Sequence, residues 1–380
     1  PTARIRNIVK QTRPPVVITD DDSHERCRHL VDSQDSSFLG VLLLESDATR
    51  TVTTAADDAA VACIDIEAQP DFNPDLSMDP NDPVYIVYTS GSTGEPKGIV
   101  QSHRSFCQFI EWQSQQFGIA ASQRVAQWAS IAYDAGYRQI FGSLCFGATL
   151  CMAPASIRYN PQGLTQWLAT ERVSILNVVP SFGSELVKVL AADNASDDQS
   201  LLPDLRQLLL TGEALSTDLA RALLSLLPTS TKLFNLYGPS ECILATYCEV
   251  KEINPAQRIV PVGKAIAGRE ILILDDEQMP CAEEVTGEIY IRSDYLTLGY
   301  LDRADETASK FIQNPCHNDY PDLVYRTGDL AKWMPDGQVE FVGRKDSQVK
   351  LRGMRVELGE IEAALSDIDD IETCAVVVHT

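Results

Sequence analysis

The sequence predicts an α/β fold with a large N-terminal lobe of mainly parallel sheets and flanking helices. Between 104 and 240, stretches of helical periodicity alternate with short apolar runs, which is the pattern of βαβ units. From 255 to 345, short strand-like segments separated by Gly, Pro and Asp predict a small β-barrel-like part. A helical pattern at 357–368 and a further apolar run at 373–380 then predict a helix and a strand at the end of the chain.

The same periodicity predicts the individual elements. Pro14 and Pro15 end a helix that begins the chain, and strands are expected after them, within 38–47 and at 84–90. Helices are predicted at 104–116, 136–146, 181–192 and 216–227. Strands are predicted at 148–154, 173–180, 205–212, 231–238 and 373–380.

The composition narrows the possible functions. The 380 residues carry 31 basic and 54 acidic side chains, a net charge of −23, which argues against binding a nucleic-acid backbone. No apolar run approaches the roughly 18 residues of a membrane helix. Ten cysteines without a CxxC pair fit a reducing, cytoplasmic setting. His24, Cys27 and His29 lie close together, but their spacing fits no closed zinc pattern.

The segment from Thr89 to Gly98 has the composition of a phosphate-binding loop. It follows a predicted strand and packs three glycines, four hydroxyl side chains and one lysine into ten residues. Glycines let the backbone turn tightly and present N–H groups to an anion, and Lys97 can neutralise a phosphate. Because Gly94 and Lys97 are not adjacent, this is not a Walker A sequence. Composition alone leaves a mobile Gly/Ser loop as an equal alternative.

A second segment, 235–241, follows an apolar strand. Ligand-binding groups of parallel α/β sheets gather at the carboxyl ends of strands. Tyr237 can stack on a base there, and Glu241 can hold Mg²⁺. The alternative is a plain turn in which Ser240 caps a helix.

A third segment, 325–330, precedes Arg344. Asp329 is well suited to accept hydrogen bonds from two ribose hydroxyls, and Arg344 can reach the same ribose or a phosphate. The alternative is a pair of β-turns, which Gly-Asp and Asp-Gly commonly form.

Taken together and in order, these segments resemble the signature motifs of the adenylate-forming superfamily. That superfamily includes acyl-CoA synthetases, luciferases and the adenylation domains of nonribosomal peptide synthetases. The matching stretches are YTSGSTGEPKGIV, LLLTGEAL, NLYGPSE and the run from YRTGDL to ELGEIE. The wording GRKDSQVKLRGMRVELGEIE is most similar to the peptide synthetase branch.

The resemblance implies an ATP-dependent enzyme that needs Mg²⁺. A substrate carboxylate attacks the α-phosphorus of ATP, and pyrophosphate leaves. In the peptide synthetase branch the activated amino acid then passes to the phosphopantetheine thiol of a carrier domain, beside a condensation domain. By motif, the pyrophosphate-side loop would comprise Thr89, Ser90, Gly91, Ser92, Thr93, Gly94 and Lys97.

The same correspondence assigns the remaining nucleotide contacts. Glu241 would bind Mg²⁺. The resemblance also implies two lobes, a large core lobe at 1–345 and the start of a small α+β C-terminal lobe at 346–380, with Asp346 as the hinge between them. Asp329, helped by Arg344, would hold the ribose. The adenine site would comprise Gly212, Glu213, Ala214, Asn235 and, stacked on the base, Tyr237.

The expectation of an amino-acid substrate rests on Asp134. In the peptide synthetase branch an Asp in the matching motif holds the substrate α-ammonium, although this chain has Tyr-Asp-Ala-Gly where Phe-Asp-x-Ser is usual. The alternative is a helix-capping Asp. Arg138 predicts a substrate with an acidic or polar side chain, unless it points out of the pocket. The implied pocket comprises Ala135, Arg138, Asn177, Leu209, Thr211, Leu236, Leu244 and Ala245.

The chain departs from the family pattern at both ends. An early motif is represented only by its tail, PTARIRNIVK, and no Lys follows Lys350, although the family usually has a reacting lysine further on. The chain is therefore expected to be truncated at both ends. An acyl- or aryl-CoA synthetase, which needs no ammonium-binding Asp, and an incomplete nucleotide-binding fragment remain alternatives.

Overall fold

The computed structural model describes residues 2–20, 40–44, 51–53, 61–63, 70–90, 96–193, 201–346, 348–351, 354–358, 361–362, 365 and 374–377. The chain divides into two compact units, Pro1–Asp79 and Pro80–Thr380. The expected lobe boundary at 345/346 stays a prediction. The weak metal candidate His24, Cys27 and His29 lies outside the described residues.

The first unit begins with the helix predicted from its sequence. Helix α1 (Thr2–Thr12) ends where Arg13 adopts a φ of 43° and two prolines follow. The strands are β1 (Val16–Asp20), β2 (Gly40–Leu44), β3 (Thr51–Thr53) and β4 (Val61–Cys63). They form one sheet in chain order, with β1 and β2 parallel and the other neighbours antiparallel.

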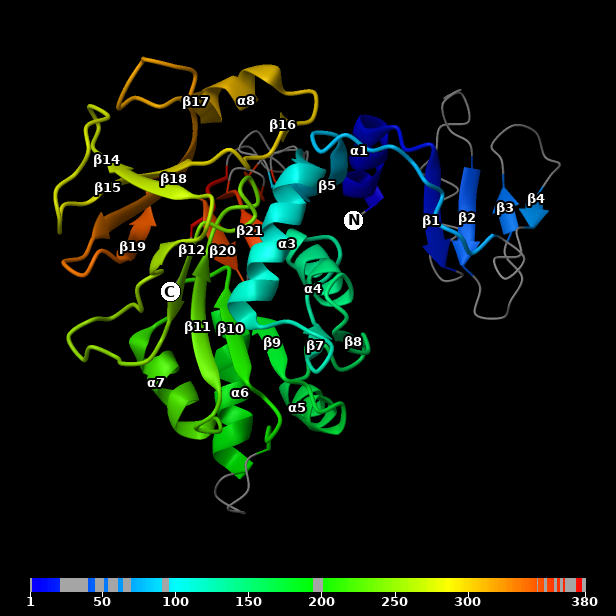
Figure 1. The fold of residues 1–380 in the computed structure, drawn as a ribbon, viewed down its shortest axis with the longest axis horizontal. Coiled ribbons are helices and arrows are strands. Elements are labelled where there is room, and N and C mark those ends of the chain that lie inside the picture. The colour runs from blue at the N-terminus through cyan, green and yellow to red at the C-terminus, as the bar shows by residue number, and fades with distance from the viewer. Residues whose placement is uncertain are drawn as a thin grey trace. The chain divides into compact units, whose positions relative to one another are not determined.

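The second unit is built on a seven-stranded sheet of order β13-β12-β11-β10-β9-β7-β8, which confirms the predicted mainly parallel lobe (Figure 1). The five strands from β11 to β8 are parallel to one another, and β12 and β13 continue the sheet antiparallel at one edge. Its strands are β7 (Arg124–Gln127), β8 (Thr149–Met152), β9 (Ile175–Val178), β10 (Gln207–Thr211), β11 (Lys232–Tyr237), β12 (Thr246–Glu249) and β13 (Lys264–Ala265).

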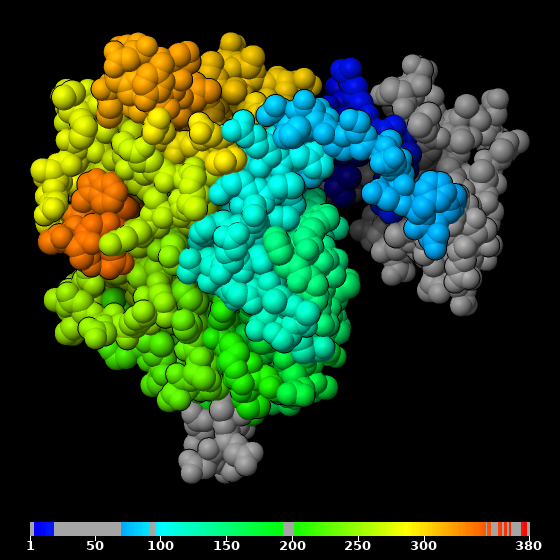
Figure 2. Space-filling view, in the orientation of Figure 1, coloured from blue at the N-terminus to red at the C-terminus, as the bar shows by residue number. Residues whose placement is uncertain are grey.

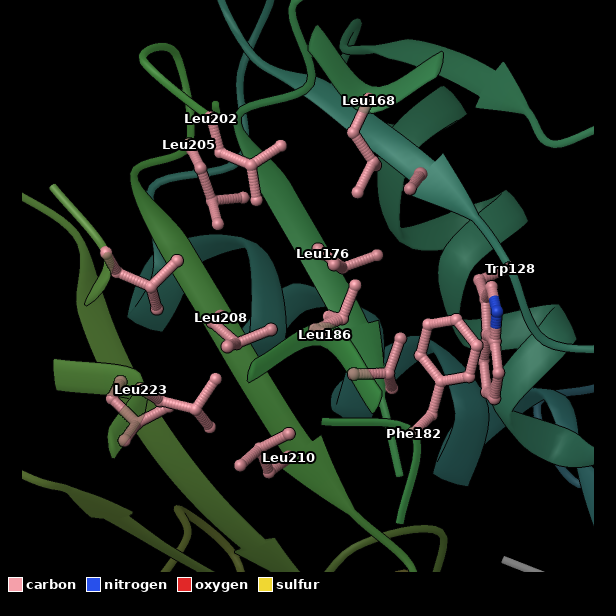
Figure 3. Close-up of a cluster of buried hydrophobic side chains, with 14 of the residues drawn as sticks. Trp128, Leu168, Leu176, Phe182, Leu186, Leu202, Leu205, Leu208, Leu210 and Leu223 are labelled. Atoms are coloured by element: carbon pink, nitrogen blue, oxygen red, sulfur yellow. The ribbon is translucent and has the colours of Figure 1, made fainter. Parts of the chain in front are cut away.

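Helices cover both faces of this sheet, so its central strands are buried on both sides. Alternate residues of β10 face opposite ways: Leu208 and Leu210 join one hydrophobic cluster, whereas Leu209 joins the other. Figure 3 shows the first cluster, and Figure 1 shows α3 crossing the opposite face. The helices are α3 (His103–Phe117), α4 (Asp134–Leu144), α5 (Pro161–Thr170), α6 (Pro180–Asp193) and α7 (Thr217–Leu226).

Local capping sets the ends of these helices. The Ser102 hydroxyl accepts the Ser105 N–H at the start of α3, and Gly118 ends it with a φ of 59°. Asn160 caps α5 in the same way, with Pro161 as the first helical residue. No helix among the described residues combines the length and the apolar character needed to cross a membrane.

An antiparallel sheet forms the predicted barrel-like part and, in yellow to orange, one end of this unit (Figure 2). It contains β14 (Glu270–Leu274), β15 (Gly287–Arg292), β18 (Leu323–Trp333), β17 (Phe311–Gln313) and β19 (Val339–Arg344). A three-stranded sheet of β5 (Pro83–Thr89), β6 (Lys97–Ser102) and β16 (Gly299–Tyr300) leads into helix α8 (Ala304–Lys310).

Near the C-terminus, β20 (Val349–Leu351) and β21 (Met354–Val356) form an antiparallel pair. The strand predicted at 373–380 is wrong for its described part, because residues 374–377 form no strand. A strand needs a neighbouring strand as hydrogen-bond partner. Here the Val376 N–H donates instead to the Glu362 carboxylate, at 2.9 Å.

Candidate functional site

The β5–β6 hairpin carries the predicted phosphate loop. Thr89 ends β5 and lies directly opposite Lys97, the first residue of β6. The Thr89 hydroxyl is buried and has no hydrogen-bond partner among the described residues, which leaves it free to donate to a ligand. Ser90 is also buried. The rest of the predicted loop, Gly91, Ser92, Thr93 and Gly94, lies outside the described residues.

Lys97 is buried, with 3% of its surface exposed. Its ammonium donates to Glu306 Oε1 at 3.0 Å and lies 4.5 Å from the centroid of the Tyr300 ring. Burial acts to raise the pKa of Glu306, but hydrogen bonds from Lys97 and Arg303 outweigh burial and hold that pKa below its ordinary value. The lysine is thus charge-compensated within the fold.

Glu241, the expected Mg²⁺ ligand, is fully buried. Its Oε1 accepts a hydrogen bond from the Tyr300 hydroxyl at 2.8 Å, and its carbonyl accepts the Thr297 N–H at 3.0 Å. Mg²⁺ commonly binds one or two carboxylates together with substrate phosphates. Glu241 is a single carboxylate, and Tyr300 contacts both it and Lys97, which fits that pattern. The described residues contain no group of three or more His, Cys, Asp or Glu suited to a metal ion.

Asp329, the predicted ribose ligand, lies at the centre of a buried network. Its Oδ2 accepts the Tyr237 hydroxyl at 2.6 Å, and its Oδ1 accepts Arg344 Nη1 at 2.5 Å. Strand pairing places Asp329 opposite Arg344. Burial first, and the Asp329 charge second, raise the pKa of Tyr237 well above its ordinary value, so the phenol stays protonated and donates.

The expected hinge residue belongs to the same network. Arg344 binds Asp346 in a two-pronged ion pair, with both N···O distances 2.7 Å. Burial acts to raise the pKa of Asp346, but the hydrogen bonds from Arg344 hold it below its ordinary value. Gly328 has a φ of +77°, and a Cβ there would lie 3.0 Å from Arg344 Nη2, so a glycine fits this turn best.

The residues predicted to line the adenine have structural partners. Gly212, Glu213 and Ala214 follow β10, whose end pairs with β11 beside Tyr237. The Glu213 carboxylate accepts both the N–H and the hydroxyl of Ser181 at the start of α6. The Asn235 side chain is buried and donates to the carbonyls of Val260 and Pro261, at 3.0 Å each.

The structure brings most of the predicted side-chain pocket together. Leu209 is the register partner of Asn177 on β9, and Thr211 is the partner of Leu236 on β11. Leu209, Leu236 and Leu244 share the hydrophobic cluster on the α3 face of the sheet. Ala245 is fully buried, whereas Ala135 packs against the cluster on the opposite face.

Asp134 and Arg138 lie one turn apart on α4. Asp134 follows the N-cap residue Tyr133, and it makes no hydrogen bond or ion pair with any described residue. Arg138 is 6% exposed, so it does not point into solvent, and its Nε has no described hydrogen-bond partner. Its guanidinium carbon lies 5.8 Å from the Phe109 ring centroid.

Tyr85, which the sequence did not single out, lies beside these two charges. Its hydroxyl is buried without a described hydrogen-bond partner. Burial, and after it the charge of Asp134, raises its pKa well above the ordinary value, whereas Arg138 acts in the opposite direction. Sequence reasoning also missed Tyr300, which reaches the site through pairing of β16 with β6, and Glu306, which reaches Lys97 from α8.

The sequence profile of AMP-binding enzymes matches residues 1–301. The chain belongs to this family of AMP-binding enzymes. Among curated proteins it is 40% identical over 301 residues to the delta-poly-L-ornithine synthetase of Acinetobacter baumannii, a match to 79% of this chain and 21% of the relative. It is 35% identical over 366 residues to surfactin synthase subunit 1 of Bacillus subtilis, a match to 93% of this chain and 10% of that protein.

Solved structures agree with this assignment. The crystal structure of IdnL1 superimposes with a TM-score of 0.79 at 26% identity, covering 99% of this chain and 71% of IdnL1. The Vibrio cholerae adenylation domain AlmE, solved in complex with glycyl-adenosine-5'-phosphate, gives a TM-score of 0.76 at 25% identity. That match covers 98% of this chain and 69% of AlmE.

Proposed function

We propose that this chain activates an amino acid as an aminoacyl-adenylate, with ATP as the second substrate and pyrophosphate as the leaving group. The observation that carries the proposal is the buried network of Tyr237, Asp329 and Arg344 in a member of the AMP-binding family. It joins an aromatic ring to a carboxylate, the groups that a base and a ribose need.

The proposed reaction is an in-line displacement at phosphorus. A carboxylate oxygen of the amino acid forms a bond to the α-phosphorus, and the bond from that phosphorus to the pyrophosphate oxygen breaks. The contribution of the chain is positioning and charge neutralisation. Lys97 and the Thr89 hydroxyl would face the pyrophosphate side, and Asp329 would fix the ribose. Glu241 would hold Mg²⁺, which neutralises phosphate charge when it is bound.

A carrier domain is the proposed second partner. The chain spans 21% and 10% of the two curated relatives named above, so it resembles one part of much longer synthetases. We infer that the phosphopantetheine thiol of a carrier domain forms a thioester with the aminoacyl group, while the bond from that group to the phosphate breaks and AMP leaves. A condensation domain is proposed to belong to the same assembly. The eight described cysteines are free, and we propose a reducing, cytoplasmic setting.

The charges on α4 support a narrower substrate class. Asp134 is without a described ion pair and would bind the α-ammonium. Arg138 is a buried guanidinium that lacks a carboxylate partner in the described part of the chain, and such a group is costly to bury unpaired. We therefore propose a substrate whose side chain carries a carboxylate or another strong acceptor.

The test is ATP–pyrophosphate exchange with a panel of acidic, neutral and basic amino acids, fatty acids and aryl acids. Exchange with one acidic amino acid that is lost in Asp134→Ala would support both proposals. For Arg138→Leu we expect the preference to move from acidic to neutral amino acids. Asp319→Asn, which removes an exposed carboxylate with no described partner, is the matched control.

Other outcomes select the alternatives. Exchange with a fatty or aryl acid that survives Asp134→Ala would identify an acyl- or aryl-CoA synthetase. Binding of ATP without exchange, with any acid of the panel, would identify an incomplete nucleotide-binding fragment. Exchange with a neutral amino acid that is unchanged in Arg138→Leu would refute the proposed acidic side chain of the substrate, but not the proposed activation of an amino acid.

A further inference from the structure

Tyr300 contacts two groups of opposite charge that the proposed function uses. Its hydroxyl donates to Glu241 Oε1 at 2.8 Å, and its ring centroid lies 4.5 Å from the Lys97 ammonium. The cation over the ring and the carboxylate at the hydroxyl are therefore held by one side chain. Tyr300 itself is buried.

Lys97 does not pair with Glu241 directly. Among the described residues, its ammonium makes one hydrogen bond, to Glu306. Glu306 is shared with Arg303, whose Nη1 donates to its second oxygen at 3.3 Å. Arg303 also donates to the carbonyl of Pro96, which directly precedes Lys97. Two N–H groups of the ammonium have no described hydrogen-bond partner and are left for acceptors such as phosphate oxygens.

The backbone fixes Tyr300 independently of these charges. Strand β16 pairs with β6, which places Tyr300 opposite Ile99. The Tyr300 N–H donates to the Thr307 hydroxyl at 3.0 Å, and its ring meets Phe311 edge-on with centroids 5.8 Å apart. A side chain held on several sides can position its neighbours because it does not follow their movements.

An ammonium and a carboxylate in the same buried region attract each other strongly, since the effective dielectric is low. If Lys97 paired with Glu241 as well as with Glu306, the Glu241 carboxylate would be less available to a metal ion, and the ammonium would keep one N–H fewer for a phosphate. We propose that Tyr300 is a positioning residue that holds Glu241 by its hydroxyl and Lys97 by its ring, and so keeps the two charges apart. Glu306 supplies the counter-charge for Lys97. This inference rests on the proposed function, because that function gives Lys97 and Glu241 their ligands.

The test measures binding of a non-hydrolysable ATP analogue to the full chain by calorimetry over a series of Mg²⁺ concentrations. Tyr300→Phe removes the hydroxyl and keeps the ring over Lys97. Glu241 then loses the hydrogen bond from Tyr300, and we expect its carboxylate to turn toward the Lys97 charge. Loss of one hydrogen bond to a charged group corresponds to about 10- to 100-fold in an equilibrium constant. We expect the Mg²⁺ concentration for half-maximal analogue binding to rise by about that factor.

Tyr300→Leu also removes the ring face. We expect it to weaken analogue binding even at saturating Mg²⁺, where Tyr300→Phe stays close to the unsubstituted chain. Tyr320→Phe, the same change at a side chain that is 53% exposed, is the control for loss of a hydroxyl. The KM for the amino acid in the exchange reaction should be unchanged in Tyr300→Phe, because Lys97 and Glu241, which Tyr300 contacts, are proposed to act on the phosphate side.

An unchanged Mg²⁺ dependence in Tyr300→Phe would overturn the inference. So would a loss of amino-acid affinity by the same factor as analogue affinity, since that result means a general structural role. If Tyr300→Leu fails to fold, the comparison of Tyr300→Phe with Tyr320→Phe still decides. An unsubstituted chain that binds no analogue at any Mg²⁺ concentration would refute the proposed function itself, and with it the roles assigned to Lys97 and Glu241.

Discussion

Asp329→Asn probes the nucleotide site and the stability of the fold together. Asp329 is 3% exposed and accepts one hydrogen bond from Tyr237 and one from Arg344. Asparagine has nearly the same shape but carries no charge, and its amide nitrogen must face Tyr237 or Arg344. Facing Tyr237, it can donate to the phenol oxygen, so both bonds become bonds between less strongly charged groups; facing Arg344, it loses that bond altogether.

The magnitude follows from those two bonds. A hydrogen bond to a charged group contributes about 1.5–3 kcal/mol, and one between neutral groups contributes about 0.5–1.5 kcal/mol. Weakening both bonds, or losing one and weakening the other, should lower the free energy of unfolding by about 2–4.5 kcal/mol. The same carboxylate is proposed to hold the ribose, so nucleotide affinity should fall by about 10- to 100-fold.

Urea unfolding monitored by tryptophan fluorescence gives the first quantity, and calorimetric titration with the ATP analogue gives the second. Asp319→Asn, an exposed position, controls for the change in net charge. A loss of unfolding free energy below about 1 kcal/mol would mean that the two short contacts of Asp329 contribute little. Unchanged nucleotide affinity in a folded variant would remove Asp329 from the proposed site.

Three further substitutions test the surroundings of the site. Gly328→Ala and Gly337→Ala both place a side chain at a positive φ, +77° and +74°, and each should cost about 1–2 kcal/mol in unfolding free energy. Only at Gly328 does the new Cβ approach Arg344, so that variant should also lose nucleotide affinity, and equal affinities would contradict this reasoning. Glu306→Gln tests the pH dependence of stability. The pKa of Glu306 in the folded chain lies below its ordinary value of 4.5. Its carboxylate therefore stabilises the fold above about pH 4.5, and this stabilisation is lost as the pH falls through the lowered pKa. The gap in unfolding free energy between the unsubstituted chain and Glu306→Gln should therefore be largest near neutral pH and shrink in acid, and a gap that stays constant in urea titrations at about pH 7 and about pH 3 would contradict the assignment.

Regular elements were predictable where periodicity was strong. The helix predicted at 104–116 is α3 (His103–Phe117), and the helix predicted at 181–192 is α6 (Pro180–Asp193). Both carry an apolar face and clear end signals, which are local properties of the sequence. The strand predicted at 373–380 was wrong in its described part, because apolar residues alone do not supply a partner strand.

The candidate site divides in the same way. The motifs identified four candidate site residues, Lys97, Glu241, Tyr237 and Asp329. Their functional roles stay predictions. The contacts among them could not be predicted, because they join distant segments. Tyr237 meets Asp329 across 92 positions of sequence, and Lys97 meets Glu306 across 209. Periodicity and motif spacing carry no information on such pairs.

By itself, the sequence determined the family, the order of the elements and the residues that carry charge, ring or hydroxyl. The tertiary structure alone decided which of these groups are paired. In the tertiary structure Lys97 contacts Glu306 and Tyr300, whereas Arg138 is buried without a carboxylate partner among the described residues. The physical reason is that motif and helix signals depend on neighbouring residues, whereas a charge pair depends on which strands become adjacent, and that is set by packing of the whole unit.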